Sequence, residues 1–118
     1  MSFTEIPERP ARLQRSHLSV PAGETRFFEK AAASAADIVM LDLEDSVAPD
    51  RKDAARKNAI AALHDVNWRG KTLSLRVNGL DTAWMYRDVS DVVEQAGDRL
   101  DLLMIPTVGT AADVYALD

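Results

Sequence analysis

The chain has 118 residues, 47% of them hydrophobic, and its 14 Lys and Arg against 19 Asp and Glu give a net charge of -5. This composition is typical of a folded domain with its own core, and the scattered basic residues argue against a nucleic-acid partner. Because the chain contains no cysteine, disulfides, thiolate zinc sites and a cysteine nucleophile are excluded.

The N-terminal residues show no targeting pattern. Residues 1–14 contain prolines and arginines without periodicity, so we expect an irregular arm there and one domain over residues 15–118. No apolar run approaches the roughly 20 residues that span a bilayer, and the first 15 residues lack the apolar segment of a signal peptide. We therefore expect a cytoplasmic protein without a membrane partner.

Strand-like and helix-like segments alternate from residue 17 onward. Strands are expected at 17–21, 38–43, 72–77 and 100–106, and helices at 24–36, 50–66, 85–96 and from 111. Asp50 is placed to cap the second helix, Gly97 to end the third, and Thr110 with Asp113 to form a capping box for the fourth.

This alternation predicts an α/β fold with a parallel sheet and right-handed crossovers. The strands recur about every 20 to 35 residues, so eight units would need the roughly 250 residues of a (β/α)8 barrel. An open doubly wound sheet also fits the length, and periodicity does not choose between the two. The fourth helix has no stop signal, which favours the N-terminal half of a barrel, about four βα units.

Candidate site residues lie at the carboxyl ends of the strands, where ligands bind in both architectures. The second strand ends in three carboxylates, Asp42, Glu44 and Asp45, which repel one another and need a counter-charge, a proton or a divalent cation. Arg76 ends the third strand and could grip a carboxylate or a developing enolate oxygen. The alternative is structural: the acids cap the next helix or form salt bridges with a neighbouring arginine, and Arg76 is then a structural partner of Glu44 or Asp45.

Other candidates are weaker. His17 and His64 lack metal-ligand spacing and are interpreted as structural, and no glycine-rich phosphate motif is present. From the residues alone, Lys30 and Arg26 on the first helix are interpreted as solvated charges, although they could meet an anionic ligand at the rim.

Several segments together resemble the N-terminal portion of the malyl-CoA/β-methylmalyl-CoA lyases, within the HpcH/HpaI aldolase/citrate lyase β-subunit family. The motif D-L-E-D is weak alone but specific together with R-V-N-G at this spacing, and the resemblance runs from about Arg15 to Asp118. The segments that carry it are R-S-H-L-S-V-P-A (15–22), A-A-D-I-V-M-L-D-L-E-D-S-V-A-P-D (35–50), L-R-V-N-G-L-D-T (75–82), M-Y-R-D-V (85–89) and E-Q-A-G-D-R-L-D-L-L-M-I-P (94–106).

The resemblance implies a homo-oligomer, a trimer or hexamer, that reversibly cleaves a 3-hydroxyacyl-CoA with Mg²⁺, or with Mn²⁺ in its place. The substrates would be acyl-CoA esters and glyoxylate. It assigns Arg76 to substrate binding and catalysis, Lys30 to coenzyme A, and Glu44 and Asp45 to a second shell around the metal. The direct metal ligands of the family come from later strands, so none is expected within residues 1–118, and the fragment alone should be inactive.

The chain departs from the family pattern at three positions, Ser19, Glu24 and Thr107, which bear on coenzyme A affinity and on the identity of the substrate. Two other functions remain open. One is a hydroxyacyl-CoA thioesterase of the same family, and the other is a non-enzymatic signalling module similar to a receiver domain. A third possibility is an inactive relic.

Overall fold

A parallel four-stranded sheet forms the centre of the computed structural model, which describes residues 8–118. Residues 1–7 of the expected arm lie outside the described residues, and residues 8–14 form no helix or strand. The strands are β1 (His17–Pro21), β2 (Ile38–Asp42), β3 (Thr72–Arg76) and β4 (Leu102–Met104). All four expected strands are confirmed, although β4 is shorter than the expected 100–106.

A helix follows each strand. α1 (Phe28–Ala33) continues the 3-10 turn η1 (Thr25–Phe27), and α2 (Lys52–Asp65) continues η2 (Pro49–Arg51). α3 (Met85–Ala96) runs into η3 (Gly97–Arg99), and α4 (Ala111–Tyr115) is a short final helix. The four expected helices are therefore present, and α4 begins with the expected capping box of Thr110 and Asp113.

The sheet order settles the architecture that periodicity left open. The strands pair in sequence order, β1-β2-β3-β4, and every pair is parallel. A doubly wound sheet reverses its strand order at a switch point, whereas a barrel adds each strand beside the last. The consecutive order is the order of a (β/α)8 barrel and differs from that of a receiver domain.

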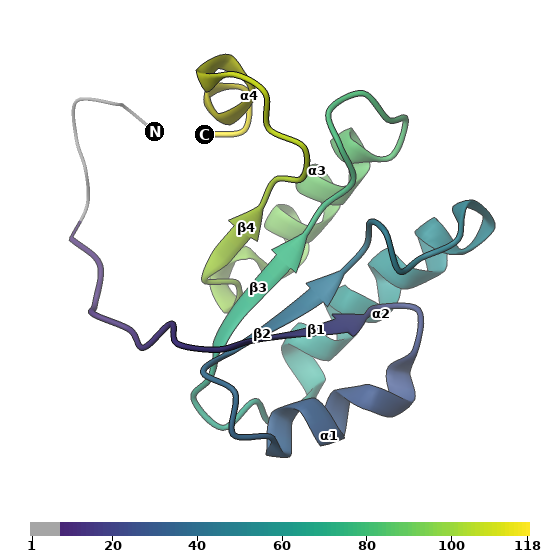
Figure 1. Ribbon diagram of the computed structural model, residues 1–118. Helices are drawn as coiled ribbons and strands as arrows, with labels where there is room; N and C mark the ends of the chain where they lie inside the picture. Colours follow the sequence, from purple (N-terminus) through teal and green to yellow (C-terminus); the bar gives the residue numbers. More distant parts are fainter. Residues whose placement is uncertain (1–7) are drawn as a thin grey trace.

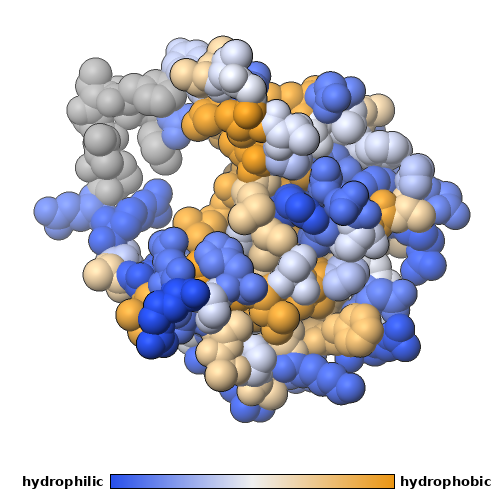
Figure 2. Space-filling view, viewed as in Figure 1, coloured by the Kyte–Doolittle hydropathy of each residue, from blue (hydrophilic) through white to orange (hydrophobic). Residues whose placement is uncertain are grey.

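The two faces of the sheet differ in chemistry. Helices α1, α2 and α3 cover one face, while no helix of residues 8–118 lies on the other (Figure 1). Alternate strand residues point to the covered face and form the core with the helices, among them Val20, Val39, Leu41, Leu73 and Leu75. The intervening residues, which include Met40, Asp42, Ser74 and Arg76, point to the helix-free face. Figure 2 shows apolar groups exposed on this face, with polar groups among them and around its borders.

The expected cap of α2 is wrong, whereas the expected end of α3 is confirmed. Asp50 lies inside η2 and makes no side-chain cap, because the chain enters α2 through a 3-10 turn. α3 ends at Ala96, with Gly97 as its C-cap. Gly97 has φ -62, a right-handed conformation, and the chain continues from it into η3.

Within residues 8–118, every helix is too short or too polar to cross a lipid bilayer. The longest, α2, has 14 residues.

Candidate active site

The carboxyl ends of β2 and β3 meet in a two-pronged ion pair. Asp42 and Arg76 are the last residues of their strands and are direct partners in the sheet register. Arg76 donates from Nε to Oδ1 of Asp42 and from Nη2 to Oδ2, each at 2.8 Å. This fork geometry fixes the plane of the guanidinium and is the strong form of a charge-assisted hydrogen bond.

Asp42 also organises the loop that follows β2. Its Oδ1 accepts from the Glu44 N–H at 2.9 Å, and its Oδ2 accepts from the N–H and hydroxyl of Ser46 at 3.1 and 2.6 Å. Burial of this carboxyl raises its pKa, but the hydrogen bonds from Arg76, Ser46 and the Glu44 N–H outweigh burial and hold the pKa of Asp42 at about 2. Asp42 is therefore an anion that aligns both Arg76 and the loop.

Glu44 and Asp45 lie at the same end of the sheet as Arg76, as expected. The Glu44 Oε2 is 3.7 Å from Arg76 Nη2, too far for a hydrogen bond but close enough for attraction. The hydrogen bond from Arg76 to Asp42 raises the pKa of Arg76, with further contributions from Glu44 and Asp45. Asp42 is therefore the principal counter-charge of Arg76, and Glu44 is a more distant one.

These acids border a hollow of about 380 Å³ that is lined by the segments following β2, β3 and β4. Its wall includes Glu44, Asp45, Lys52, Asn78, Asp81 and Thr107. Carboxylate and amide oxygens suit a hard divalent cation such as Mg²⁺. No group of three or more His, Asp or Glu in the described part of the chain could hold a metal by itself. The residues present therefore fit an outer, water-mediated shell better than a complete set of ligands.

A buried polar network connects the end of β3 to helices α2 and α3. Asp88 on α3 accepts from both the main-chain N–H and the side-chain amide of Asn78, at 3.0 and 2.6 Å. Arg56 on α2 donates to the same carboxylate at 3.0 Å. Asn78 follows Arg76 by two residues, so this network ties the site to both helices.

Lys30, the expected coenzyme A contact, lies away from Arg76. It lines a separate hollow of about 310 Å³ beside β1 and α1, together with Ser19 and Phe27. This hollow shares no lining residue with the one beside Glu44. Glu24 pairs with Arg26 at 3.2 Å, and Thr107 has a positive φ of 53 at the rim of the acidic hollow.

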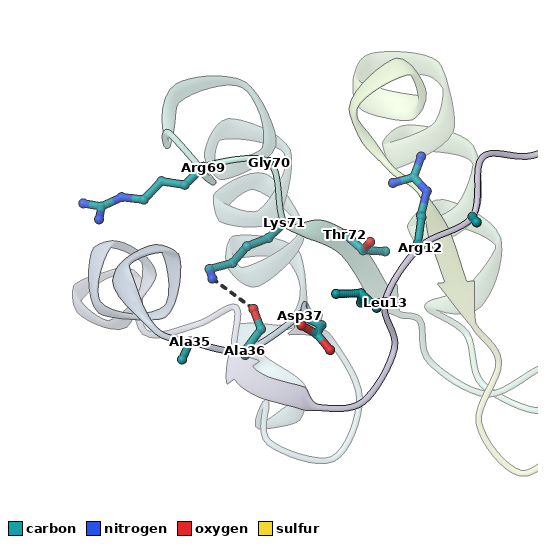
Figure 3. A pocket seen from close by; sticks show the side chains of 10 residues that line it. Arg12, Leu13, Ala35, Ala36, Asp37, Arg69, Gly70, Lys71 and Thr72 are labelled. Carbon is teal, nitrogen blue, oxygen red and sulfur yellow. Dashed lines mark hydrogen bonds between the residues drawn. The ribbon is translucent and has the colours of Figure 1, made fainter.

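A third hollow, of about 420 Å³, lies at the opposite ends of the strands, and the charged groups that line it serve the fold (Figure 3). Lys71 there donates to the carbonyls of Ser34 and Ala36, and Asp37 pairs with Arg15 at 2.9 Å. These charges are already satisfied by the fold. The hollow also lies at the amino ends of the strands, where barrel enzymes do not place their chemistry.

Comparisons with known proteins agree with this geometry. The family model described as HpcH/HpaI aldolase/citrate lyase matches residues 15–118. The chain belongs to this family. It is 59% identical over all 118 residues to an L-malyl-CoA/β-methylmalyl-CoA lyase of Cereibacter sphaeroides strain ATCC 17029, and spans 37% of that relative's length. The resemblance drawn from the sequence motifs is confirmed.

A second relative and a solved structure extend the comparison within the family. The chain is 42% identical over 103 residues, 87% of its length, to a (3S)-malyl-CoA thioesterase of Cereibacter sphaeroides strain ATCC 17025, and covers 35% of that protein. Protein CitE from Mycobacterium tuberculosis, solved with magnesium, acetoacetate and coenzyme A, superposes with a TM-score of 0.72 at 34% identity. That match covers 89% of this chain and 38% of CitE. The expected fold class, part of a (β/α)8 barrel, is confirmed.

Arg76 lies beside acids, as the sequence predicts, but its principal partner, Asp42, is not the expected one. Glu44 and Asp45 were the expected structural partners, whereas Asp42 makes the fork and Glu44 only a longer contact. The available signal was position, since Asp42 and Arg76 both end adjacent strands. Lys52 and the network of Arg56, Asn78 and Asp88 were missed, because their contacts join residues far apart in sequence.

Proposed function

We propose that residues 15–118 are part of a longer, Mg²⁺-dependent CoA-ester lyase, with residues 1–14 as its N-terminal arm. The enzyme would reversibly cleave malyl-CoA or β-methylmalyl-CoA to acetyl-CoA or propionyl-CoA plus glyoxylate. The observation that carries this proposal is the Arg76 guanidinium, held in a fork by fully buried Asp42 beside the Glu44 carboxylate. Identity of 59% across the whole chain to a lyase of that name supports it.

Arg76 is proposed as the residue that stabilises the transition state. When the bond between C2 and C3 of a 3-hydroxyacyl thioester breaks, the C3 hydroxyl loses its proton and becomes the carbonyl of glyoxylate. The electron pair stays on the acyl fragment as an enolate with charge on the thioester oxygen, and a proton returned to C2 completes the acyl-CoA product. Two guanidinium nitrogens, Nε and Nη2, are bonded to Asp42. Nη1 takes no part in that fork, so it can donate to the developing oxyanion without reorganising the group.

Glu44 and Asp45 are proposed to support the metal through its waters. When bound, Mg²⁺ supplies Lewis acidity toward the oxygens of the hydroxy acid. This ion keeps several waters in proteins, and two carboxylates at the rim of a hollow can order those waters. Mn²⁺ is an alternative ion. The direct ligands are proposed to come from parts of the longer polypeptide outside this chain, and the 118 residues alone are proposed to be inactive.

Lys30 is proposed to contact coenzyme A from the hollow beside β1 and α1. A positive side chain next to Phe27 and Ser19 suits a ligand with anionic phosphates and an apolar arm. The other assignments from the family resemblance remain proposals for the longer protein: acyl-CoA and glyoxylate as substrates, a homo-oligomeric trimer or hexamer, and a cytoplasmic location.

A thioesterase acting on the same hydroxyacyl-CoA is the second candidate, favoured by the 42% identity to a (3S)-malyl-CoA thioesterase. The two reactions start from one substrate and differ in the bond that breaks. Incubating the full-length protein with malyl-CoA and Mg²⁺ distinguishes them. Acetyl-CoA and glyoxylate in equal amounts are the expected products, whereas free malate with free coenzyme A would reject the lyase in favour of hydrolysis.

A further inference from the structure

Lys52 is a buried cation whose contacts are directed at the loop after β2. It begins α2, and only 6% of its surface is exposed. Its ammonium donates to the carbonyl of Leu43 at 2.9 Å and to the carbonyl of Glu44 at 2.6 Å. The ammonium also lies 5.3 Å from the centre of the Trp84 ring, within range of a cation–π attraction.

This arrangement is unusual for a side chain that serves only the scaffold. None of the ion pairs found within residues 8–118 includes Lys52, so its charge is balanced by carbonyl dipoles and an aromatic face. Burying an ammonium without a carboxylate is costly, and an apolar residue would fill the same place more cheaply. The Lys52 ammonium is therefore expected to have a role, beyond filling space, that offsets the free-energy cost of its burial.

The gain is visible in the main chain of Glu44. Its N–H is held by Asp42 Oδ1, and its carbonyl is held by Lys52 Nζ. Both polar groups that flank the Glu44 Cα are thus fixed by side chains from different elements, β2 and α2. With its backbone fixed in this way, Glu44 projects its carboxylate from a set position toward the Arg76 guanidinium, 3.7 Å away.

We propose that Lys52 is a positioning residue, which orders the Glu44 and Asp45 carboxylates beside the hollow so that a divalent cation binds there through its waters. This inference rests on the proposed function for the identity of the ligand. Groups that hydrogen-bond a metal's ligands typically change metal affinity or activity by 10–100-fold when removed, and Lys52 would act by placing such groups. The contribution of Lys52 is the placement of the loop, because it touches Glu44 only through the main chain.

The test compares Lys52→Met with Lys57→Met in the full-length protein. Both changes remove one lysine from α2, but Lys57 is exposed. Mn²⁺ binding is measured without substrate by electron paramagnetic resonance, together with the Mg²⁺ activation constant and the KM for malyl-CoA. Lys52→Met is expected to raise the Mn²⁺ Kd about 10-fold while the thioester KM changes less than about twofold. Lys57→Met should leave all three values unchanged.

A double variant shows whether Lys52 acts through Glu44. Glu44→Gln and Lys52→Met should each weaken Mn²⁺ binding, and the combination should be no worse than the stronger single change, because residues that act as a unit are not additive. Full additivity would overturn the coupling. An Mn²⁺ Kd that is unchanged or lower in Lys52→Met would overturn the positioning role. Loss of a residue that serves only the scaffold would change the melting temperature alone, and loss of a cation that merely repels the metal would tighten metal binding.

Lys52→Arg covers the case in which Lys52→Met fails to fold. Arginine keeps the charge, but its planar group does not reproduce two carbonyl contacts made from one nitrogen. An intermediate rise in the Mn²⁺ Kd is expected. A Kd equal to that of the wild type would overturn the proposal. If the wild type binds Mn²⁺ but does not cleave malyl-CoA, the proposed reaction fails while the metal-binding comparison still decides the role of Lys52.

Discussion

At the scale of single residues, the guanidinium of Arg76 is the group whose geometry matters most. Arg76→Lys keeps the positive charge but loses the fork to Asp42 and the fixed direction of the remaining N–H groups. Turnover of malyl-CoA by the full-length protein is expected to fall at least roughly 10²-fold. Steady-state kinetics measure this loss. Arg87→Lys is the control, because Arg87 is an exposed arginine on α3. Near-normal turnover in Arg76→Lys would exclude a role in the transition state.

Asp42 should make the free energy of unfolding depend on pH in the acidic range. Its pKa is about 2 in the folded state, against roughly 3.9 for an unfolded Asp. A group with a lowered pKa stabilises the fold fully above the unfolded value, and this stability is lost as pH falls through the folded value. The contribution is about 2 kcal/mol, lost between about pH 4 and pH 2.

Urea unfolding of the wild type and Asp42→Asn measures this contribution. Asparagine does not titrate, and its amide places donors against the donors of Arg76 and Ser46, so the variant should be less stable near neutral pH. The stability difference between the two proteins should narrow as the pH drops from 4 to 2. A constant difference across that range would show that Asp42 does not carry the charge in the folded state.

At the scale of elements, the buried pair of Arg56 and Asp88 joins α2 to α3 and, through Asn78, to the end of β3. Both side chains of the pair are at least 95% buried. Asp88→Asn removes the negative charge and leaves Arg56 without its buried partner, which should lower the free energy of unfolding by about 3 kcal/mol. Asp91→Asn is the matched control, because Asp91 is 31% exposed and 3.5 Å from Arg56. It should cost less than about 1 kcal/mol.

Asp88→Asn also tests whether the network positions the site in addition to stabilising the fold. Asn78 follows Arg76 closely in sequence, so a loosened Asp88 also frees the end of β3. Asp88→Asn should therefore reduce turnover at temperatures where the protein remains folded, and chemical denaturation with activity assays on the same samples checks both effects. Equal stability losses in Asp88→Asn and Asp91→Asn would contradict a special role for the buried pair.

At the scale of the whole molecule, the sheet formed by the described residues 8–118 has two unpaired edges and one face without helices. β1 and β4 are the end strands of the sheet, and α1, α2 and α3 cover only one face (Figure 1). Unpaired strand edges and exposed apolar faces promote association. The 118-residue chain by itself is expected to self-associate, which light scattering after size exclusion measures. A monodisperse monomer with a cooperative melting transition would contradict this expectation.

Residue patterns along the chain were sufficient to predict the class of fold and the end of the sheet at which the site residues lie. Alternating strand and helix patterns specify parallel strands, and parallel strands bring their carboxyl ends to one edge, so Arg76, Glu44 and Asp45 had to lie near one another. Local patterning was sufficient for this conclusion, because each element is defined by residues that are neighbours in the chain.

Only the tertiary structure decided which groups pair. Asp42 and Arg76 are 34 residues apart in sequence and pair because of the strand register. Arg56 and Asp88 are 32 residues apart and pair because α2 packs beside α3. The same holds for Lys52, whose ammonium reaches the Glu44 carbonyl only because α2 packs back onto the end of β2. Hydrogen bonds act over about 3 Å, so a pattern along the chain does not specify these contacts until the fold sets the distances between the groups.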